Sequence, residues 1–165
     1  MSRSVHPLLL EPSYWNQRLS ELEEGAGSMF SSPREDLSGS GREVEEFRLK
    51  THDGQLLWGL IAYPTFFQGS RPCCIKAAGP AEPIVLDPSA PETGTVEILY
   101  QVPAGRRLED RVVDLLRIYA QARRQPRIEP TALRLSETSR VQRDEFWIAS
   151  ELLRRMPPKR GVGQV

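Results

Sequence analysis

His52 is one of only two histidines in this chain, and it stands beside a carboxylate, Asp53. A histidine next to an acid could serve as a general base together with the group that orients it. Neighbouring residues in a tight turn rarely face each other, however, and the four residues at 51–54, Thr-His-Asp-Gly, have the composition of a turn. We therefore interpret His52 and Asp53 as turn residues.

The two cysteines are also adjacent, at Cys73 and Cys74. A redox pair would need them to face each other, but neighbours on a strand point to opposite faces, so we expect two buried thiols. Together with His6 and His52 they show no spacing typical of a metal site. The sequence also contains no Gly-x-x-x-x-Gly-Lys phosphate loop. We predict no metal and no cofactor.

Arginine supplies 19 of the 22 basic residues, and many of them lie in the C-terminal part. Residues 1–43 and 44–103 each carry 4 basic and 7 acidic residues, a net charge of −3, whereas residues 104–165 carry 14 and 8, a net charge of +6. Such a segment can bind an acidic partner or nucleic acid, or it can be a solvated face. The zero total charge makes nucleic acid the less expected ligand. The candidate binding residues are Arg106, Arg107, Arg111, Arg123 and Arg124.

The elements that must position these residues begin after a segment of low complexity. Residues 1–43 contain 16 Gly, Ser and Pro, a composition that favours a flexible N-terminal arm. A short amphipathic helix is predicted near residues 13–24, because Trp15, Leu19 and Leu22 form one apolar stripe. An isolated helix of this length is only marginally stable in water. Its apolar stripe should therefore pack on the chain's own domain or on a protein partner.

A strand pattern starts at residue 44. Alternating apolar residues predict a β-hairpin from strands at 44–50 and 55–63 around the turn at 51–54. Further strands are predicted at 73–78 and 96–102, with an irregular proline-rich segment at 81–94 between them.

The second half of the chain alternates between helix and strand. Apolar residues at helical spacing and acidic residues in the first turn predict a helix at 108–124, followed by a strand at 131–135 and a last helix ending at residue 156. This order predicts an α/β fold, in which the hairpin leads into a small, mostly parallel β-α-β-α sheet. We assign residues 44–156 to one α/β domain and residues 157–165 to a basic C-terminal tail.

Two segments carry a family resemblance. The hairpin at 47–64 and the helix-to-strand segment from 110–116 through 127–130 resemble the N-terminal half of α/β-hydrolases of the acetyl xylan esterase and dienelactone hydrolase type. In that family the second segment leads through a proline-containing turn into the strand that carries the nucleophile. The resemblance implies that residues 132–135 form this strand.

Ser139 then occupies the position of the nucleophile. The family's nucleophile elbow has the pattern Gly-x-Ser-x-Gly, whereas the flanking residues here are Glu137 and Val141. The family's catalytic histidine follows the serine in the chain, yet His6 and His52 both precede Ser139. The resemblance therefore implies a truncated or degenerate relative that lacks catalytic activity on its own.

These observations leave three hypotheses for function. The sequence favours a non-catalytic α/β-hydrolase-like domain that acts by binding or protein interaction, through the stripe of Trp15, Leu19 and Leu22 or through the arginine-rich helix. The alternatives are a carboxylic-ester hydrolase component that uses Ser139 and is completed by another chain, and an arginine-mediated binder of nucleic acid or an acidic partner. We expect a cytoplasmic protein, because the sequence shows no secretory signal, no membrane span and no disulfide framework.

Overall fold

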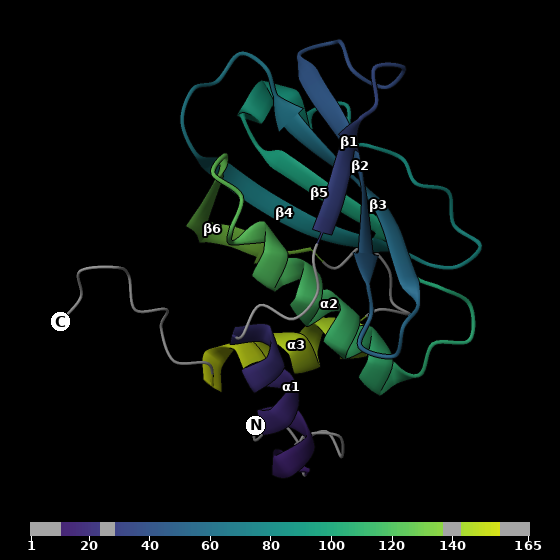
Figure 1. Ribbon diagram of the computed structural model, residues 1–165. Coiled ribbons are helices and arrows are strands. Elements are labelled where there is room, and N and C mark those ends of the chain that lie inside the picture. The colour runs from purple at the N-terminus through teal and green to yellow at the C-terminus, as the bar shows by residue number, and fades with distance from the viewer. Residues whose placement is uncertain (1–10, 24–28, 137–142, 156–165) are drawn as a thin grey trace, which may run out of the picture.

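The computed structural model describes residues 11–23, 29–136 and 143–155 of the chain, as a six-stranded sheet covered on one face by three α-helices (Figure 1). Helix α2 lies against the sheet, and α1 and α3 pack on α2 (Figure 1). The elements in chain order are α1 (Pro12–Glu23), β1 (Met29–Pro33), β2 (Arg42–Lys50), β3 (Leu56–Pro64), β4 (Arg71–Ala78), the 3₁₀-helix η2 (Ala90–Thr93), β5 (Val96–Gln101), α2 (Leu108–Ala122), β6 (Ile128–Leu135) and α3 (Arg143–Arg155).

The sheet has the strand order β1-β2-β3-β5-β4-β6. Strand β4 pairs in parallel with both β5 and β6, which confirms the predicted α/β fold with its β-α-β-α series. The remaining pairs, β1 with β2, β2 with β3 and β3 with β5, are antiparallel, so the sheet is mixed. Strand β5 thus lies between β3 and β4, which precede it in the chain.

The predicted hairpin is present as β2 and β3. Phe47 pairs with Gly59 and Leu49 with Leu57 across it. The turn is closed by the amide of Thr51, which donates to the carbonyl of Gln55 at 2.7 Å. Gly54 adopts a φ of 88°, a conformation that favours glycine, so the Thr-His-Asp-Gly composition does form the turn it predicts.

Strand β1 corrects the prediction that residues 1–43 are a flexible arm. Residues 29–33 pair with β2 in the register Met29 with Leu49 and Pro33 with Glu45, and β2 itself begins at Arg42. Met29 packs against the main core. The sheet therefore extends upstream of the predicted boundary at residue 44. The predicted tail at 157–165 lies outside the described residues.

Helix α1 shows where the predicted apolar stripe packs. Trp15 and Leu22 are almost fully buried, and Leu19 packs beside them. Trp15 and Leu22 belong to the same core cluster as the inner side of α2, and Leu19 packs against this cluster. Of the two alternatives for this stripe, docking on the chain's own domain is therefore the one observed, and the partner surface predicted there is already covered.

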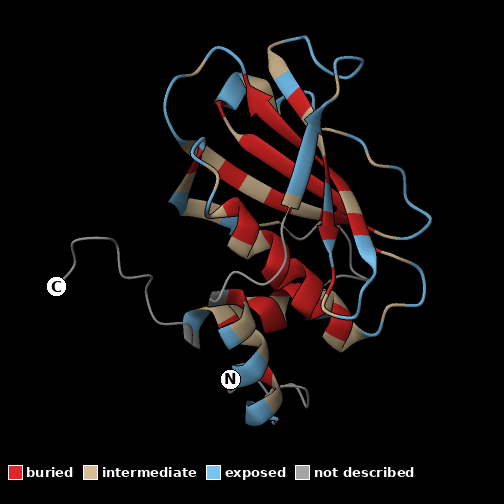
Figure 2. Cartoon of the chain, in the orientation of Figure 1, coloured by how far each residue is buried: buried red, intermediate tan, exposed pale blue. Residues whose placement is uncertain are grey.

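Buried residues, red in Figure 2, gather on the inner strands and on α2. The buried apolar side chains form a large core and a small one. The large core lies between the sheet and the helices, and the ring of Phe47 passes so close to Gly59 that a Cβ atom there would lie 2.5 Å from it. On the opposite face Val44, Leu60 and Ala62 form the small cluster. Cys73 is buried in the large core, whereas Cys74 is half-buried, and both are free thiols.

Candidate functional site

The three parallel strands end at one edge of the sheet, which we call the carboxyl edge. The connection after β4 leads to β5 on one side of it. The connection after β5 passes through α2 and over β4 to β6 on the other side. The direction of the connections therefore reverses between β4 and β6. In open α/β sheets ligands bind outside the carboxyl ends of the strands at such a point. Because β3 runs antiparallel to β5, with Trp58 opposite Gln101, the turn at 51–54 also lies at this edge.

His52 makes a contact at the carboxyl edge that the turn interpretation did not include. Its Nε2 lies 3.0 Å from Oδ1 of Asp110 in the first turn of α2, and the two side chains are only 15% and 10% exposed. Nε of Arg107 donates to the other carboxylate oxygen of Asp110 at 3.3 Å. A histidine with an orienting acid is therefore present, but the acid is Asp110 and not the adjacent Asp53.

Arg106 joins the turn to helix α2. Its guanidinium binds Asp114 through two hydrogen bonds of 3.1 and 2.7 Å and also donates to Asp53. The side chains of Arg106 and Asp114 are each 2% exposed. Hydrogen bonds from Thr51 and Arg106 lower the pKa of Asp53 to about 2, and burial raises the pKa of Asp114 although Arg106 opposes the shift. Arg106 therefore holds two elements together and is not available to a ligand.

A second buried group of polar side chains connects β5, α2 and α3. Glu145, in the first turn of α3, is fully buried, and Oε1 lies 3.5 Å from Nη1 of Arg111. Both carboxylate oxygens of Glu145, Nε of Arg111 and the hydroxyl of Tyr100 are buried without a hydrogen-bond partner. Burial raises the pKa of Glu145 to about 7 and that of Tyr100 well above its usual value.

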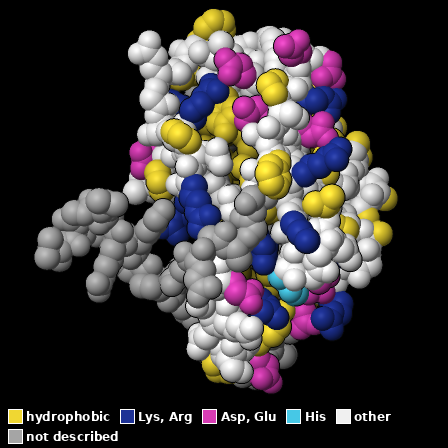
Figure 3. Space-filling model, in the orientation of Figure 1, with side chains coloured by type: hydrophobic (Ala, Val, Ile, Leu, Met, Phe, Trp, Pro, Cys, Tyr) yellow, Lys and Arg dark blue, Asp and Glu magenta, His cyan; other side chains and the backbone are white. Residues whose placement is uncertain are grey.

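The structure does not bring the five candidate arginines together. Arg106, Arg107 and Arg111 lie around the start of α2 and form ion pairs there. Arg123 and Arg124 lie beyond its other end, about 22 Å away at the rise of an α-helix. Arg123 stands over the ring of Tyr119, and Arg124 donates to the carbonyl of Leu22 at 3.3 Å. Figure 3 shows acidic, basic and histidine side chains interspersed on one face of the molecule.

Ser139, the predicted nucleophile position, lies outside the described residues. Strand β6 is the strand that the resemblance implied, and its end is anchored by the amide of Ser136, which donates to the carbonyl of Ile75 at 2.8 Å. Within the described part of the chain, no group of three or more His, Cys, Asp or Glu side chains could hold a metal ion. The described helices include none that is long and apolar enough to cross a membrane.

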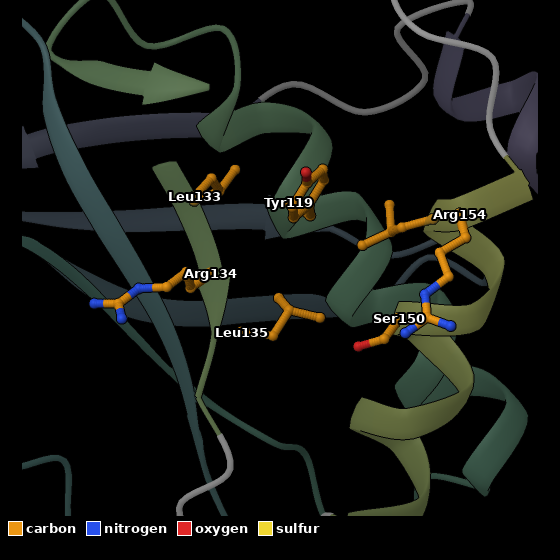
Figure 4. A pocket seen from close by; sticks show the side chains of 7 residues that line it. Tyr119, Leu133, Arg134, Leu135, Ser150 and Arg154 are labelled. Atoms are coloured by element: carbon orange, nitrogen blue, oxygen red, sulfur yellow. The ribbon is translucent and has the colours of Figure 1, made fainter. Parts of the chain in front are cut away.

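A hollow of about 460 Å³ lies between β6, α2 and α3 (Figure 4). Leu133 and Leu135 point from the strand toward Tyr119 of α2 and toward α3, whereas the side chain of Arg134 extends to the other side of the strand (Figure 4). Sequence analysis did not anticipate this hollow. Its lining residues are Tyr119, Leu133, Arg134, Leu135, Ser150, Leu153 and Arg154.

The fold is similar to those of solved acetyl xylan esterases. No protein-family model and no curated protein matches the sequence. Acetyl xylan esterase 1 from a Thermoanaerobacterium species aligns over 85% of this chain with a TM-score of 0.68 and 12% identity, and an acetyl xylan esterase from a Paenibacillus species aligns over 75% with a TM-score of 0.61 and 11% identity. The alignments cover 53% and 50% of those proteins, so the chain spans about half their length. The likeness shows that this chain has an α/β-hydrolase-like fold.

Proposed function

We propose that this chain is a non-catalytic α/β-hydrolase-like domain that acts by binding another protein. The observation that carries the proposal is the internal pairing of the charged groups at the carboxyl edge. Arg106 is bound by Asp53 and Asp114, and His52 is bound by Asp110. At the carboxyl edge these side chains are therefore used to hold the hairpin on α2.

The sequence around Ser139 supports the same conclusion. A nucleophile elbow is a sharp turn with little room beside the serine, and the flanking residues are Glu137 and the β-branched Val141. A carboxylate at position 137 would also oppose the negative charge of the oxyanion that forms during ester hydrolysis.

The proposal is tested by measuring hydrolysis of p-nitrophenyl acetate and labelling by a fluorophosphonate probe. We expect the purified chain to show the same low background rate as its Ser139→Ala variant, and no labelling of Ser139. Ser136→Ala serves as a matched control at the end of β6. A rate well above background that is lost in Ser139→Ala and retained in Ser136→Ala would overturn the proposal.

A second candidate function is that of a hydrolase component completed by another chain. It is favoured by the comparison, since the two structures described above are acetyl xylan esterases and the chain spans about half their length. Co-expression with the remaining half of the Thermoanaerobacterium esterase tests it. Hydrolysis that appears only in the combined sample and requires Ser139 would support this function, whereas an inactive mixture of two chains that co-purify would count against it.

We also propose a reducing, cytoplasmic setting. Both cysteines are free thiols, and burial raises the pKa of Cys73, so this thiol is held in its unreactive protonated form. Such thiols need no oxidising compartment.

A further inference from the structure

We propose that the free side of β6 binds an extended, acidic segment of a partner protein, which pairs with β6 as an additional strand. By the free side we mean the side of β6 that faces away from β4. The inference rests on the proposed function, because it names the surface and the class of partner through which the domain would bind.

The backbone of β6 has room for another strand. Strand β6 pairs with β4, and no other described strand pairs with it. The amide of Ser136 points toward β4, because it donates to Ile75. Backbone groups alternate in direction along a strand, so the amides and carbonyls of Leu133 and Leu135 point to the free side. They are positioned to form the hydrogen bonds of a further ladder.

The two outer strands of the sheet, β1 and β6, differ in how well they are protected against pairing with another chain. Strand β1 is a short, largely exposed strand with two serines, and it ends at Pro33. A short strand with proline is a poor template for another chain. In the first half of β6, Pro130 has no backbone N–H group to donate to a further strand. The residues from Thr131 to Leu135 contain no proline and include half-buried apolar side chains. The second half of β6 is therefore the better template.

The hollow beside β6 provides space for the side chains of an added strand. Leu133, Leu135, Leu153 and Tyr119 contribute its apolar lining and are only partly buried by the chain itself. Alternate side chains of a strand point to the same face. Every second residue of a strand added at β6 would thus lie toward this hollow, and apolar residues at these positions would complete the burial of the leucines.

The charges on both faces of β6 determine the class of partner. Arg134 extends to the face of the strand opposite the hollow and forms no ion pair with another described residue. On the side of the hollow, Arg154 has a side chain 75% exposed, and Arg123 stands over Tyr119. Glu151, which binds Arg154 at 3.1 Å, is the acidic residue paired with these arginines. A second copy of the chain would bring the same arginines, and residues 157–165 carry Lys159 and Arg160 but no acid. An acidic segment of a different protein is the complementary occupant.

The test uses the full chain and a fluorescein-labelled peptide, Asp-Val-Glu-Leu-Asp-Ile-Glu, in which apolar and acidic residues alternate. We expect fluorescence anisotropy to show saturable binding, and hydrogen exchange measured by NMR to show protection of the amides of Leu133 and Leu135. Arg134→Glu should weaken binding at least tenfold. Arg48→Glu is the matched control, because Arg48 is an exposed arginine on β2, and it should leave the affinity unchanged.

A second peptide separates strand addition from charge attraction. It has the same side chains but N-methyl groups at alternate positions, which remove the donors that a ladder requires. Equal binding of the two peptides, an affinity unaffected by Arg134→Glu, or a dimer of the chain that excludes the peptide would each overturn the inference. These outcomes leave the absence of catalysis untouched, whereas hydrolysis that depends on Ser139 would overturn the proposed function without altering peptide binding.

Discussion

Glu145 carries a carboxyl group that the fold buries without a hydrogen-bond donor. The charged and titratable groups that face it are Arg111 and Asp114 on α2 and Tyr100 on β5. Arg111 favours the carboxylate, whereas burial and the charge of Asp114 oppose it, and the pKa rises from 4.5 to about 7. The folded chain therefore binds a proton at Glu145 that the unfolded chain releases near pH 4.5.

Glu145 should consequently make the stability depend on pH. The contribution of the protonated Glu145 is complete below pH 4.5 and is lost as the pH rises through about 7, a change on the order of 3 kcal/mol in the free energy of unfolding. We expect Glu145→Gln to remove this part of the pH dependence and to be more stable than the unmodified chain at pH 8. Urea unfolding at pH 5 and pH 8 measures the difference.

Glu151→Gln is the control for this prediction. Glu151 lies on the same helix, but it pairs with the exposed Arg154. Its substitution should leave the difference between the two pH values unchanged. A pH dependence that is equally large in Glu145→Gln would show that another group is responsible.

At this same scale, the sequence predicted the local role of His52 but not its partner. Thr51, Asp53 and Gly54 form the turn through contacts within a few residues, and these are visible in composition. Asp110 lies 58 positions away, where the local pattern shows only an acidic residue in the first turn of a helix. The contact between His52 and Asp110 depends on β3 pairing with β5, which no local pattern encodes.

At the scale of elements, α1 is held by its tertiary contacts. It has 12 residues, which is too short for a stable isolated helix, and Trp15 is 2% exposed within the main core. We expect Trp15→Ala to lower the free energy of unfolding by about 3 to 5 kcal/mol, the usual cost of removing a large buried aromatic side chain. Urea unfolding followed by circular dichroism measures this cost.

Gln17→Ala is the matched substitution on the exposed side of α1. It should change the free energy of unfolding by less than about 0.5 kcal/mol. If Trp15→Ala costs no more than Gln17→Ala, helix α1 does not pack on α2 in solution.

Elements whose apolar residues recur at a regular helical or strand spacing could be predicted from the sequence. Helix α2 was expected at 108–124 and is found at Leu108–Ala122, because its apolar side repeats at helical spacing. Strand β1 was missed, because Ser31, Ser32 and Pro33 show no strand alternation. It is a strand because β2 offers an edge to pair with and Met29 reaches the core. Local sequence does not carry information of this kind.

At the scale of the whole molecule, the basic and acidic residues are equal in number, and the arginines at the start of α2 are paired within the chain. The total is 22 basic and 22 acidic residues, and Arg106, Arg107 and Arg111 are each paired with a carboxylate of the chain. Binding of nucleic acid needs unpaired cations that can replace the counterions of several phosphates. We expect the chain to pass through a heparin column without retention at low salt.

A variant with Glu109→Gln and Glu151→Gln is the control for the heparin column. It removes the carboxylates beside Arg107 and Arg154 and should be retained more strongly. Tight retention of the unmodified chain, with elution that depends steeply on salt, would instead support the hypothesis of an arginine-mediated nucleic-acid binder.

The position of β5 between β3 and β4 has a consequence for synthesis of the chain. Strands β3 and β4 leave the ribosome before β5. The sides of β3 and β4 that pair with β5 therefore have no hydrogen-bond partner until β5 is synthesised. If β3 and β4 paired with each other first, β5 would have no place in the sheet. The proline-rich connection at 79–95 lengthens this interval, during which β3 has a free edge on the side away from β2 and β4 has no partner, so a chaperone would find exposed apolar strand edges.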